Sequence, residues 1–259
     1  MLLALDVGNT NITIGAFDGP TLKAHWRIAT EAQRLADEYA VTLLNLFKLR
    51  GLEPSDFHCA VLASVVPSLT PVFEEVCRRY FEAAPVTVGT GTRTGLRILY
   101  DTPREVGADR VVDAVAALKL YGPPPLVIVD FGTATVFDAL NADGDYLGGA
   151  IAPGITIAAQ ALFEKASLLW TVKLERPRSA IGKNTVNALQ AGIMFGYVGL
   201  VEGIVNRFKE ELGGEATVVA TGGLAEVIAR ETTTIDHIDQ DLTLVGLRLI
   251  HDMNRETRE

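Results

Sequence analysis

The sequence of 259 residues has few cysteines, few histidines and no concentration of basic residues. Its two cysteines exclude a disulfide framework and are typical of a reducing compartment. Its four histidines are not paired with these cysteines at the spacing of metal ligands, which argues against a structural zinc site. The net charge is −9, so the chain also lacks the basic face that a nucleic-acid-binding protein usually carries.

Long apolar runs and targeting signals are missing as well. The segment that comes closest to a membrane span, residues 190–205, contains four glycines and Glu202, which favours a buried helix. The N-terminus has neither the basic region nor the small-residue cleavage site of a signal peptide. We therefore expect a cytoplasmic protein that binds neither a membrane nor nucleic acid, and whose 48% of hydrophobic residues form a sizeable core.

Apolar runs of strand length alternate with amphipathic helical patterns along the chain. The runs cover residues 2–6, 12–17, 58–65, 126–130, 134–140 and 217–220, and the helical patterns cover 34–49, 69–82, 107–121, 185–212 and 241–253. This alternation predicts an α/β fold. Because only a short turn joins the first two runs, those two strands must be antiparallel, and we expect a mixed sheet.

One hairpin pattern occurs twice. The stretch ALDVGNTNITIGAFDGPTLKAHWRI resembles VIVDFGTATVFDALNADGDYLGGAI at a shift of 124 residues, which places Thr13 opposite Phe137. Such a repeat predicts two similarly folded domains, although a chance likeness remains the alternative. The prolines of YGPPPL, residues 121–126, cannot continue a helix, so we place the boundary there, between domains 1–120 and 121–259.

Each copy of the hairpin turns through Asp-x-Gly followed by small polar residues. Glycine lets the backbone approach phosphate oxygens, and the amides and hydroxyls that follow it can donate to them. The aspartate would hold a cation that offsets the phosphate charge. An ordinary hairpin with a polar cap is the alternative for either turn taken alone. The sequence contains neither a Walker A motif nor a Rossmann glycine pattern.

Two further stretches carry candidate chemistry. In TPREVGADRVVDAVAAL, residues 102–118, Asp109 could act as a general base and Arg110 as an anion anchor, with Gly107 leaving room for a substrate. The same pair could instead be a helix-start charge with a surface partner. In VVATGGLAEVIA, the turn Thr221-Gly222-Gly223 is either a nucleotide edge or a plain connection between strand and helix.

Together these stretches resemble the type III pantothenate kinases, a family within the superfamily of acetate and sugar kinases, heat-shock chaperones and actin. The resemblance covers essentially the whole chain. Its motifs, in order, are DVGNTNITIG (6–15), Tyr100 with DTPREVGADR (101–110), DFGTATVFD (130–138), GGAIAPGI (148–155) and GKNTVNALQAGIMFG (182–196).

The resemblance implies two duplicated ribonuclease-H-like domains with mixed sheets flanked by helices, an actin-like ATPase fold. It also implies ATP-dependent phosphorylation of pantothenate to 4'-phosphopantothenate, the first step of coenzyme A biosynthesis, by a homodimer. ATP with a divalent cation, expected to be Mg²⁺, and a monovalent cation, potassium or ammonium, would take part.

The resemblance assigns site residues by motif. Asp109 would be the catalytic proton acceptor and Asp130 the ligand of the monovalent cation. The residues expected to bind ATP are Asp6, Val7, Gly8, Asn9, Thr10, Asn11, Ile12, Thr13 and Thr133. Those expected to bind pantothenate are Tyr100, Gly107, Ala108, Asp109, Arg110 and, from the partner side, Thr185.

Two other functions stay open on the sequence alone. Some relatives of this family are described as transcription accessory factors, so a non-catalytic regulatory homologue is one alternative. A sugar or acid kinase of the same superfamily is the other, because a shared fold does not fix the substrate. The aspartates at positions 6, 109 and 130 favour an enzyme.

Overall fold

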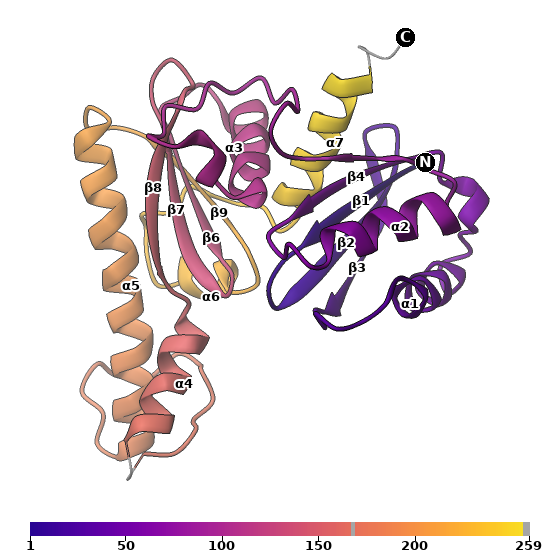
Figure 1. The fold of residues 1–259 in the computed structure, drawn as a ribbon. Coiled ribbons are helices and arrows are strands. Elements are labelled where there is room, and N and C mark those ends of the chain that lie inside the picture. The colour runs from indigo at the N-terminus through magenta and orange to yellow at the C-terminus, as the bar shows by residue number, and fades with distance from the viewer. Residues whose placement is uncertain (167–168, 256–259) are drawn as a thin grey trace. The chain divides into compact units, whose positions relative to one another are not determined.

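The computed structural model describes residues 1–166 and 169–255, and these fold into two compact units. Unit 1 comprises residues 1–96, 100–116 and 241 onward, and unit 2 comprises residues 97–99 and 117–240. The elements of unit 1 are β1 (Leu2–Val7), β2 (Asn11–Asp18), β3 (Thr21–Ala29), α1 (Ala36–Lys48), β4 (Cys59–Ser64), α2 (Thr70–Tyr80), β5 (Pro85–Thr87) and α7 (Leu242–Arg255). Helix α3 (Ala108–Tyr121) contains the boundary between the units (Figure 1).

Unit 2 is built around a second sheet. Its elements are β6 (Leu126–Phe131), β7 (Ala134–Leu140), β8 (Tyr146–Pro153), α4 (Ile155–Lys165), α5 (Thr185–Glu211), β9 (Thr217–Thr221), α6 (Ala225–Ala229) and β10 (His237–Ile238). Short 3-10 turns at Pro54–Asp56 and Pro103–Glu105 complete the described secondary structure.

The two sheets have the same topology. The strand order is β3-β2-β1-β4-β5 in unit 1 and β8-β7-β6-β9-β10 in unit 2. In each sheet the first three strands form an antiparallel meander. The fourth strand in the order pairs in parallel with the third, and the fifth pairs in parallel with the fourth. The predicted α/β class, with mixed sheets and flanking helices, is confirmed.

The repeat differs from the sequence alignment by one residue. Asp6 pairs with Thr13 in the first hairpin, whereas Asp130 pairs with Val136 in the second. The counterpart of Thr13 is therefore Val136, and the predicted match to Phe137 is wrong. The second turn is one residue shorter. An ungapped shift of 124 residues therefore aligns β1 with β6 correctly but misaligns β2 with β7 by one residue. Both meanders have a register shift at the same place, at Ala16/Phe17 and at Ala139/Leu140.

The sheet of unit 1 is covered on both faces. Leu3 and Leu5 of β1 face α1 and α2, whereas Leu2 and Ala4 face the first half of α3 and α7. This alternation is the two-residue period of a β-strand. Because α7 buries its apolar side against β1 and β4, residues 241–255 belong to unit 1 by packing, unlike the division at residue 121 expected from the sequence.

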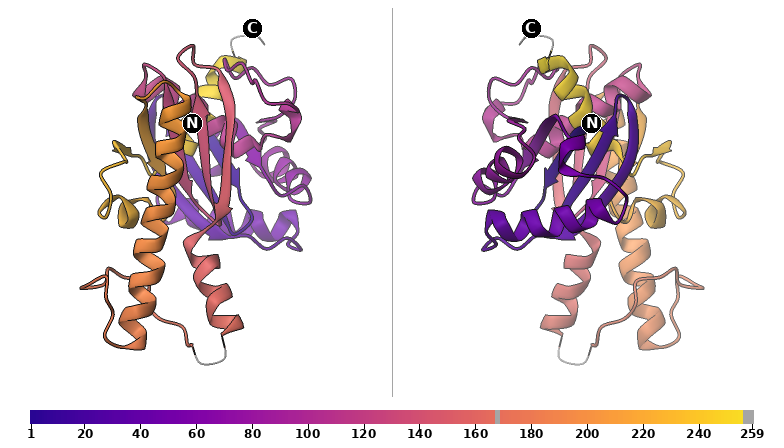
Figure 2. Two further views of the ribbon diagram at one scale, coloured as in Figure 1. Left: turned by 90° about the vertical axis from the view of Figure 1, so that its left-hand side faces the viewer. Right: turned by 90° about the vertical axis from the view of Figure 1, so that its right-hand side faces the viewer.

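Helix α5 dominates unit 2. Met194, Val201 and Val205 pack against β6 and β9 in the core of this unit, and α4 runs beside the start of α5 past the end of the sheet (Figures 1 and 2). Among the described helices, α5 alone is long and apolar enough to cross a membrane, and 44% of its most apolar window is buried. This is weak evidence for a span, because core helices meet the same criteria.

Candidate active site

The first candidate feature is the turn between β1 and β2. The N–H of Gly8 donates a 3.0 Å hydrogen bond to the carbonyl oxygen of Asn11. A Cβ at position 8 would lie 2.9 Å from the same oxygen, so the tight turn requires glycine. Asn9, Thr10 and Asn11 are exposed. The turn therefore exposes polar side chains at the end of a buried strand.

The residues expected to bind ATP fall into two groups. Val7 and Ile12 are fully buried in the core, so only their backbone could take part in binding. Asp6 and Thr13 are half-buried and directly opposite each other on adjacent strands. Paired residues point to the same face of a sheet, so the carboxylate and the hydroxyl lie side by side.

Asp109 lies on this same face of unit 1. Asp6 shares the face of β1 that carries Leu2 and Ala4, against which α3 packs, and Asp109 is in the first turn of α3. Val65 links the two regions at the end of β4. Its N–H donates to the carbonyl oxygen of Val7 at 3.0 Å, and its Cγ1 would lie 3.7 Å from a Cβ on Gly107.

The side chain of Asp109 is half-buried, and its carboxyl group is held in place. Its Oδ1 accepts a 2.8 Å hydrogen bond from the N–H of Arg110. Burial raises the pKa of Asp109, and the hydrogen bond and charge of Arg110 lower it by less. Arg110 therefore favours the ionised form of Asp109, but desolvation has the larger effect and the net shift of this pKa is upward.

The other residues predicted to bind pantothenate in unit 1 surround Asp109 in sequence. Arg110 is buried, whereas Gly107, Ala108 and Tyr100 are half-buried. A Cβ on Gly107 would overlap Oδ1 of Asp109. Glycine at this position therefore leaves space for the carboxyl group itself, in addition to any substrate.

Unit 2 contains the second turn. Gly132 donates its N–H to the carbonyl oxygen of Ala134 at 3.0 Å, as Gly8 does in the first turn. Thr133 is exposed at the tip, and Asp130 is half-buried at the end of β6. A Cβ on Gly132 would lie 3.3 Å from Oδ2 of Asp130. The second turn thus also joins an aspartate to exposed polar groups.

Gly222 lies against the other carboxylate oxygen of Asp130. It has a φ of +90°, and a Cβ there would overlap Oδ1 of Asp130 and lie 2.7 Å from the backbone nitrogen of Phe131. The preceding residue, Thr221, pairs with Asp130 across β6 and β9. The structure therefore brings the Thr221-Gly222-Gly223 turn, whose role the sequence left open, directly against the Asp130 carboxylate.

Two residues that the sequence did not single out also touch the turns. Thr30 donates its N–H to the carbonyl oxygen of Thr10 at 3.0 Å, and Gly154 donates its N–H to the carbonyl oxygen of Thr133 at 3.1 Å. Thr30 and Gly154 are 124 residues apart. This separation equals the shift of the internal repeat, so the repeat was the sequence signal that could have paired these two positions.

Comparison with known proteins identifies the family. The model of the type III pantothenate kinase family matches residues 2–207. A type III pantothenate kinase from Roseiflexus sp. (strain RS-1) is 54% identical over 255 residues, which cover 98% of this chain and 100% of that protein. The chain belongs to the type III pantothenate kinase family.

Solved structures share the fold at low sequence identity. A Campylobacter jejuni protein described as a Baf family transcriptional activator has a TM-score of 0.63 and 18% identity, covering 98% of this chain and 99% of its own. The activator of 2-hydroxyisocaproyl-CoA dehydratase from Clostridium difficile, solved with bound ADPNP, has a TM-score of 0.54 and 13% identity, covering 99% and 96%. At these identities the likeness shows the fold alone. It agrees with the predicted actin-like ATPase fold.

A kinase of this family uses ATP with a divalent cation, and the described residues are consistent with metal binding through phosphate. They contain no group of three or more His, Cys, Asp or Glu side chains that could hold a metal ion. Mg²⁺ is commonly bound through one or two carboxylates and substrate phosphates, so it does not require such a group. Asp130, which Gly132 and Gly222 approach closely, offers one carboxylate and nearby backbone, which fits a cation that prefers oxygen ligands.

Thr185 is the remaining predicted substrate residue. It is exposed and is the first residue of α5 in unit 2. The preceding Asn184 caps the helix by accepting a 2.9 Å hydrogen bond from the N–H of Asn187. The cap fixes the start of the helix, and Thr185 lies exposed in its first turn.

Proposed function

We propose that the chain transfers the γ-phosphoryl group of ATP to the primary hydroxyl of pantothenate, in the cytoplasm, as the first step of coenzyme A biosynthesis. The observation that carries this proposal is the match to type III pantothenate kinases at 54% identity over nearly the whole length of both chains. The geometry of the Asp109 region supports it, because a half-buried carboxyl group lies on the same face of the sheet as a polar turn.

Asp109 accepts the proton in this reaction. The hydroxyl oxygen of pantothenate forms a bond to the γ-phosphorus while the bond from that phosphorus to the bridging oxygen breaks. ADP leaves with the electron pair, and the hydroxyl proton passes to the Asp109 carboxylate. The raised pKa of Asp109 makes its ionised form a stronger base than an exposed aspartate.

The two turns hold the nucleotide. Residues 6–13 and Thr133 bind the phosphates through backbone N–H groups and hydroxyls, as expected for glycine-containing turns. Tyr100, Gly107, Ala108 and Arg110 bind pantothenate, with Thr185 contributing from the partner side, as the family resemblance implies. The buried guanidinium of Arg110 suits an anionic group of the substrate.

The proposal includes two cations. When bound, Mg²⁺ and a monovalent cation (potassium or ammonium) neutralise phosphate charge. Asp130 would hold the monovalent ion, supported by the close approach of Gly132 and Gly222 to its two carboxylate oxygens. Asp6, at the equivalent strand end in unit 1, would orient metal-bound water toward the phosphates.

The proposal also includes a homodimer. Gly192, Gly196 and Gly199 form an exposed stripe along α5, and a Cβ at each would meet open space. Large exposed apolar side chains accompany them in unit 2: Ile151, Ile157, Leu162, Trp170, Ile181 and Val186. A small-residue helix face and exposed apolar side chains in the same unit support close packing of a second copy.

The homodimer is tested by sedimentation or light scattering. Ile157→Glu on α4 should shift the protein toward monomer, because it would bury a charge in the interface. Val41→Glu, at an exposed apolar position on α1, should leave the mass unchanged. A wild-type monomer at micromolar concentration would contradict this part of the proposal.

The activity is tested by incubating the protein with ATP, Mg²⁺ and pantothenate, with and without potassium or ammonium. We expect 4'-phosphopantothenate and ADP in equal amounts, with a higher rate when a monovalent cation is present. ADP release with sugars or short acids, but not with pantothenate, would instead support another kinase of the superfamily. Absence of turnover with all of these substrates would support the non-catalytic regulatory alternative.

A further inference from the structure

Thr30 binds the first turn at two points. Its Oγ1 donates a 2.7 Å hydrogen bond to the carbonyl oxygen of Gly8, and its N–H donates to the carbonyl oxygen of Thr10. The residue before it, Ala29, pairs with Asn11 at the end of β3. One residue thus fixes two carbonyl groups of the turn, and each bond orients a peptide plane whose other end carries the N–H of the following residue.

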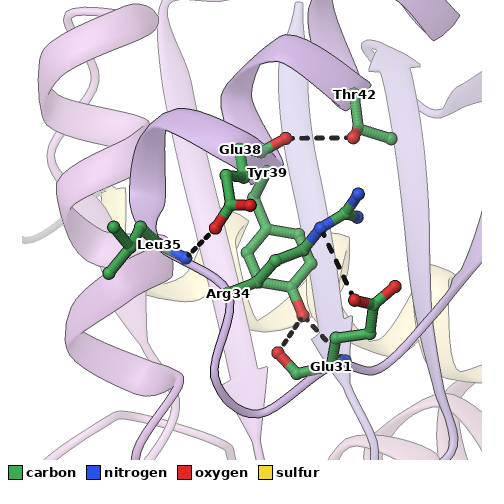
Figure 3. A network of polar contacts seen from close by, with 6 residues as sticks. All are labelled: Glu31, Arg34, Leu35, Glu38, Tyr39 and Thr42. Carbon is green, nitrogen blue, oxygen red and sulfur yellow. Dashed lines mark hydrogen bonds and ion pairs between the residues drawn. The ribbon is translucent and has the colours of Figure 1, made fainter.

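The backbone that follows Thr30 is anchored to the core. The N–H of Glu31 donates to the hydroxyl oxygen of Tyr39, and this hydroxyl donates to the carbonyl oxygen of Glu31, both at 3.0 Å. Tyr39 is fully buried, with its ring 4.7 Å from that of Phe73. Arg34 covers the Tyr39 ring and forms an ion pair with Glu31 (Figure 3). Thr30 is therefore connected to a rigid part of unit 1.

The second hairpin has an equivalent brace made in another way. Gly154 occupies the position of Thr30, and a Cβ there would overlap the carbonyl oxygen of Thr133 and lie 2.7 Å from that of Gly132. Tyr197 of α5 donates to the carbonyl oxygen of Pro153 at 3.3 Å, just before Gly154. Both copies thus hold the turn from the residue after the third strand, and a buried tyrosine from a helix bonds a residue adjacent to it in sequence.

We propose that Thr30 is a positioning residue for nucleotide binding, which sets the 8–11 turn in the orientation that receives the phosphates of ATP. This inference rests on the proposed function of the turn. Thr30 acts through Gly8 and Thr10 and does not itself contact the substrate. The hydroxyl is the distinctive element, because any residue other than proline can supply the N–H.

Three variants test the role of the hydroxyl. Thr30→Val keeps the shape of the side chain but removes the donor, and Thr30→Ser restores it. Thr42→Val is the matched control, because the Thr42 hydroxyl donates to the carbonyl oxygen of Glu38 within α1 (Figure 3). We expect Thr30→Val to raise KM for ATP, and Kd for a non-hydrolysable ATP analogue, by about two- to tenfold, the effect of one lost hydrogen bond.

The pattern of effects separates positioning from stability. KM for pantothenate and kcat at saturating ATP should stay within about twofold of wild type, which is a smaller change than the loss of one hydrogen bond causes. Thr30→Ser should recover the affinity for the analogue, and Thr42→Val should change neither affinity. Unchanged analogue binding in Thr30→Val would overturn the inference. The inference would also be overturned if Thr30→Val weakened the affinities for ATP and pantothenate equally and Thr30→Ser did not restore them.

Failure of the proposed function would look different. If wild type bound the ATP analogue but formed no phosphopantothenate, the kinase reaction would be wrong, while the analogue affinities of the Thr30 variants would still decide the positioning role. If wild type did not bind the analogue at all, the assignment of the turn to nucleotide would fail, and the inference about Thr30 would fail with it.

Discussion

The backbone N–H of Arg110 donates a 2.8 Å hydrogen bond to Oδ1 of Asp109, a carboxyl group whose pKa is raised by burial. The hydrogen bond fixes the direction of the side chain, and burial increases its basicity when ionised. A carboxylate that is both oriented and basic is suited to remove a proton from an alcohol as it attacks phosphorus. The first three predictions concern this group.

Asp109→Asn should reduce kcat by about 10²- to 10⁴-fold, the usual contribution of a general base. The amide is similar in size but cannot accept the proton. ATP-analogue affinity should stay close to wild type, because the first turn is untouched. Asp101→Asn, which changes an exposed carboxylate nearby, is the control for local charge. Loss of nucleotide binding together with turnover would argue against the role of base.

The pH profile of kcat/KM should report the raised pKa of Asp109. Only the ionised carboxylate can accept a proton, so activity should fall on the acidic side with a midpoint above 3.8, the ordinary value for aspartate. Arg110→Gln removes a charge that lowers this pKa, so the acidic limb should move to higher pH. An unchanged midpoint in that variant would show that another group controls the limb.

Asp109 should also affect stability in a pH-dependent way. Because its pKa is higher in the folded protein, the folded state binds its proton more tightly than the unfolded state does. The resulting stability is present below pH 3.8 and is lost as pH rises through the folded pKa. Asp109→Asn imitates the protonated form, so it should raise Tm at pH 7, and the gain should shrink as pH falls toward 4. An equal gain at both values would contradict this linkage.

Much of the fold followed from the sequence because the first hairpin, the second hairpin and the long helices have strong periodic patterns. Three of the elements that the sequence did not predict, β5, β10 and α4, have weak local signals. β5 and β10 have three and two residues, which are too few for a periodic pattern. Helix α4 has no side-chain cap, and it exposes both apolar residues (Ile157 and Leu162) and polar ones (Gln160 and Glu164), so its sequence has no clear amphipathic pattern.

Long-range relationships were the other part that the sequence could not supply. The packing of α7 against β1 joins residues more than 200 positions apart, and no local pattern encodes it. The one-residue difference between the turns depends on which strand residues pair. The sequence identified Asp109 and Asp130 as candidates, but the approach of Gly107 and Gly222 to their carboxyl groups is a property of the folded backbone.

Gly107→Ala should impair catalysis by displacing the Asp109 carboxyl group. The added methyl group would overlap Oδ1, and misplacement of a reacting group by about 1 Å can cost about 10²-fold in rate. Gly89→Ala is the matched control in unit 1, since a Cβ there meets no atom within 4 Å. The measurement is kcat for both variants, with thermal unfolding to confirm folding. A folded Gly107→Ala enzyme with wild-type kcat would show that Asp109 tolerates the displacement.

Asp130 and Gly222 should act together in the response to a monovalent cation. Asp130→Ala removes the carboxylate, so we expect loss of activity and of stimulation by potassium. Gly222→Ala keeps the carboxylate but crowds its Oδ1, and should raise the potassium concentration needed for half-maximal activity. The measurement is initial rate against potassium concentration at fixed ionic strength.

The control for Gly222→Ala must share its backbone strain without its contacts. Gly214 has a φ of +109°, and a Cβ there would meet open space, so Gly214→Ala introduces the strain of a left-handed residue alone. Both variants should lose stability, but only Gly222→Ala should alter the potassium response. If Gly214→Ala shifted that response equally, global destabilisation would explain the effect. Turnover by Asp130→Ala that still rises with potassium would place the cation elsewhere.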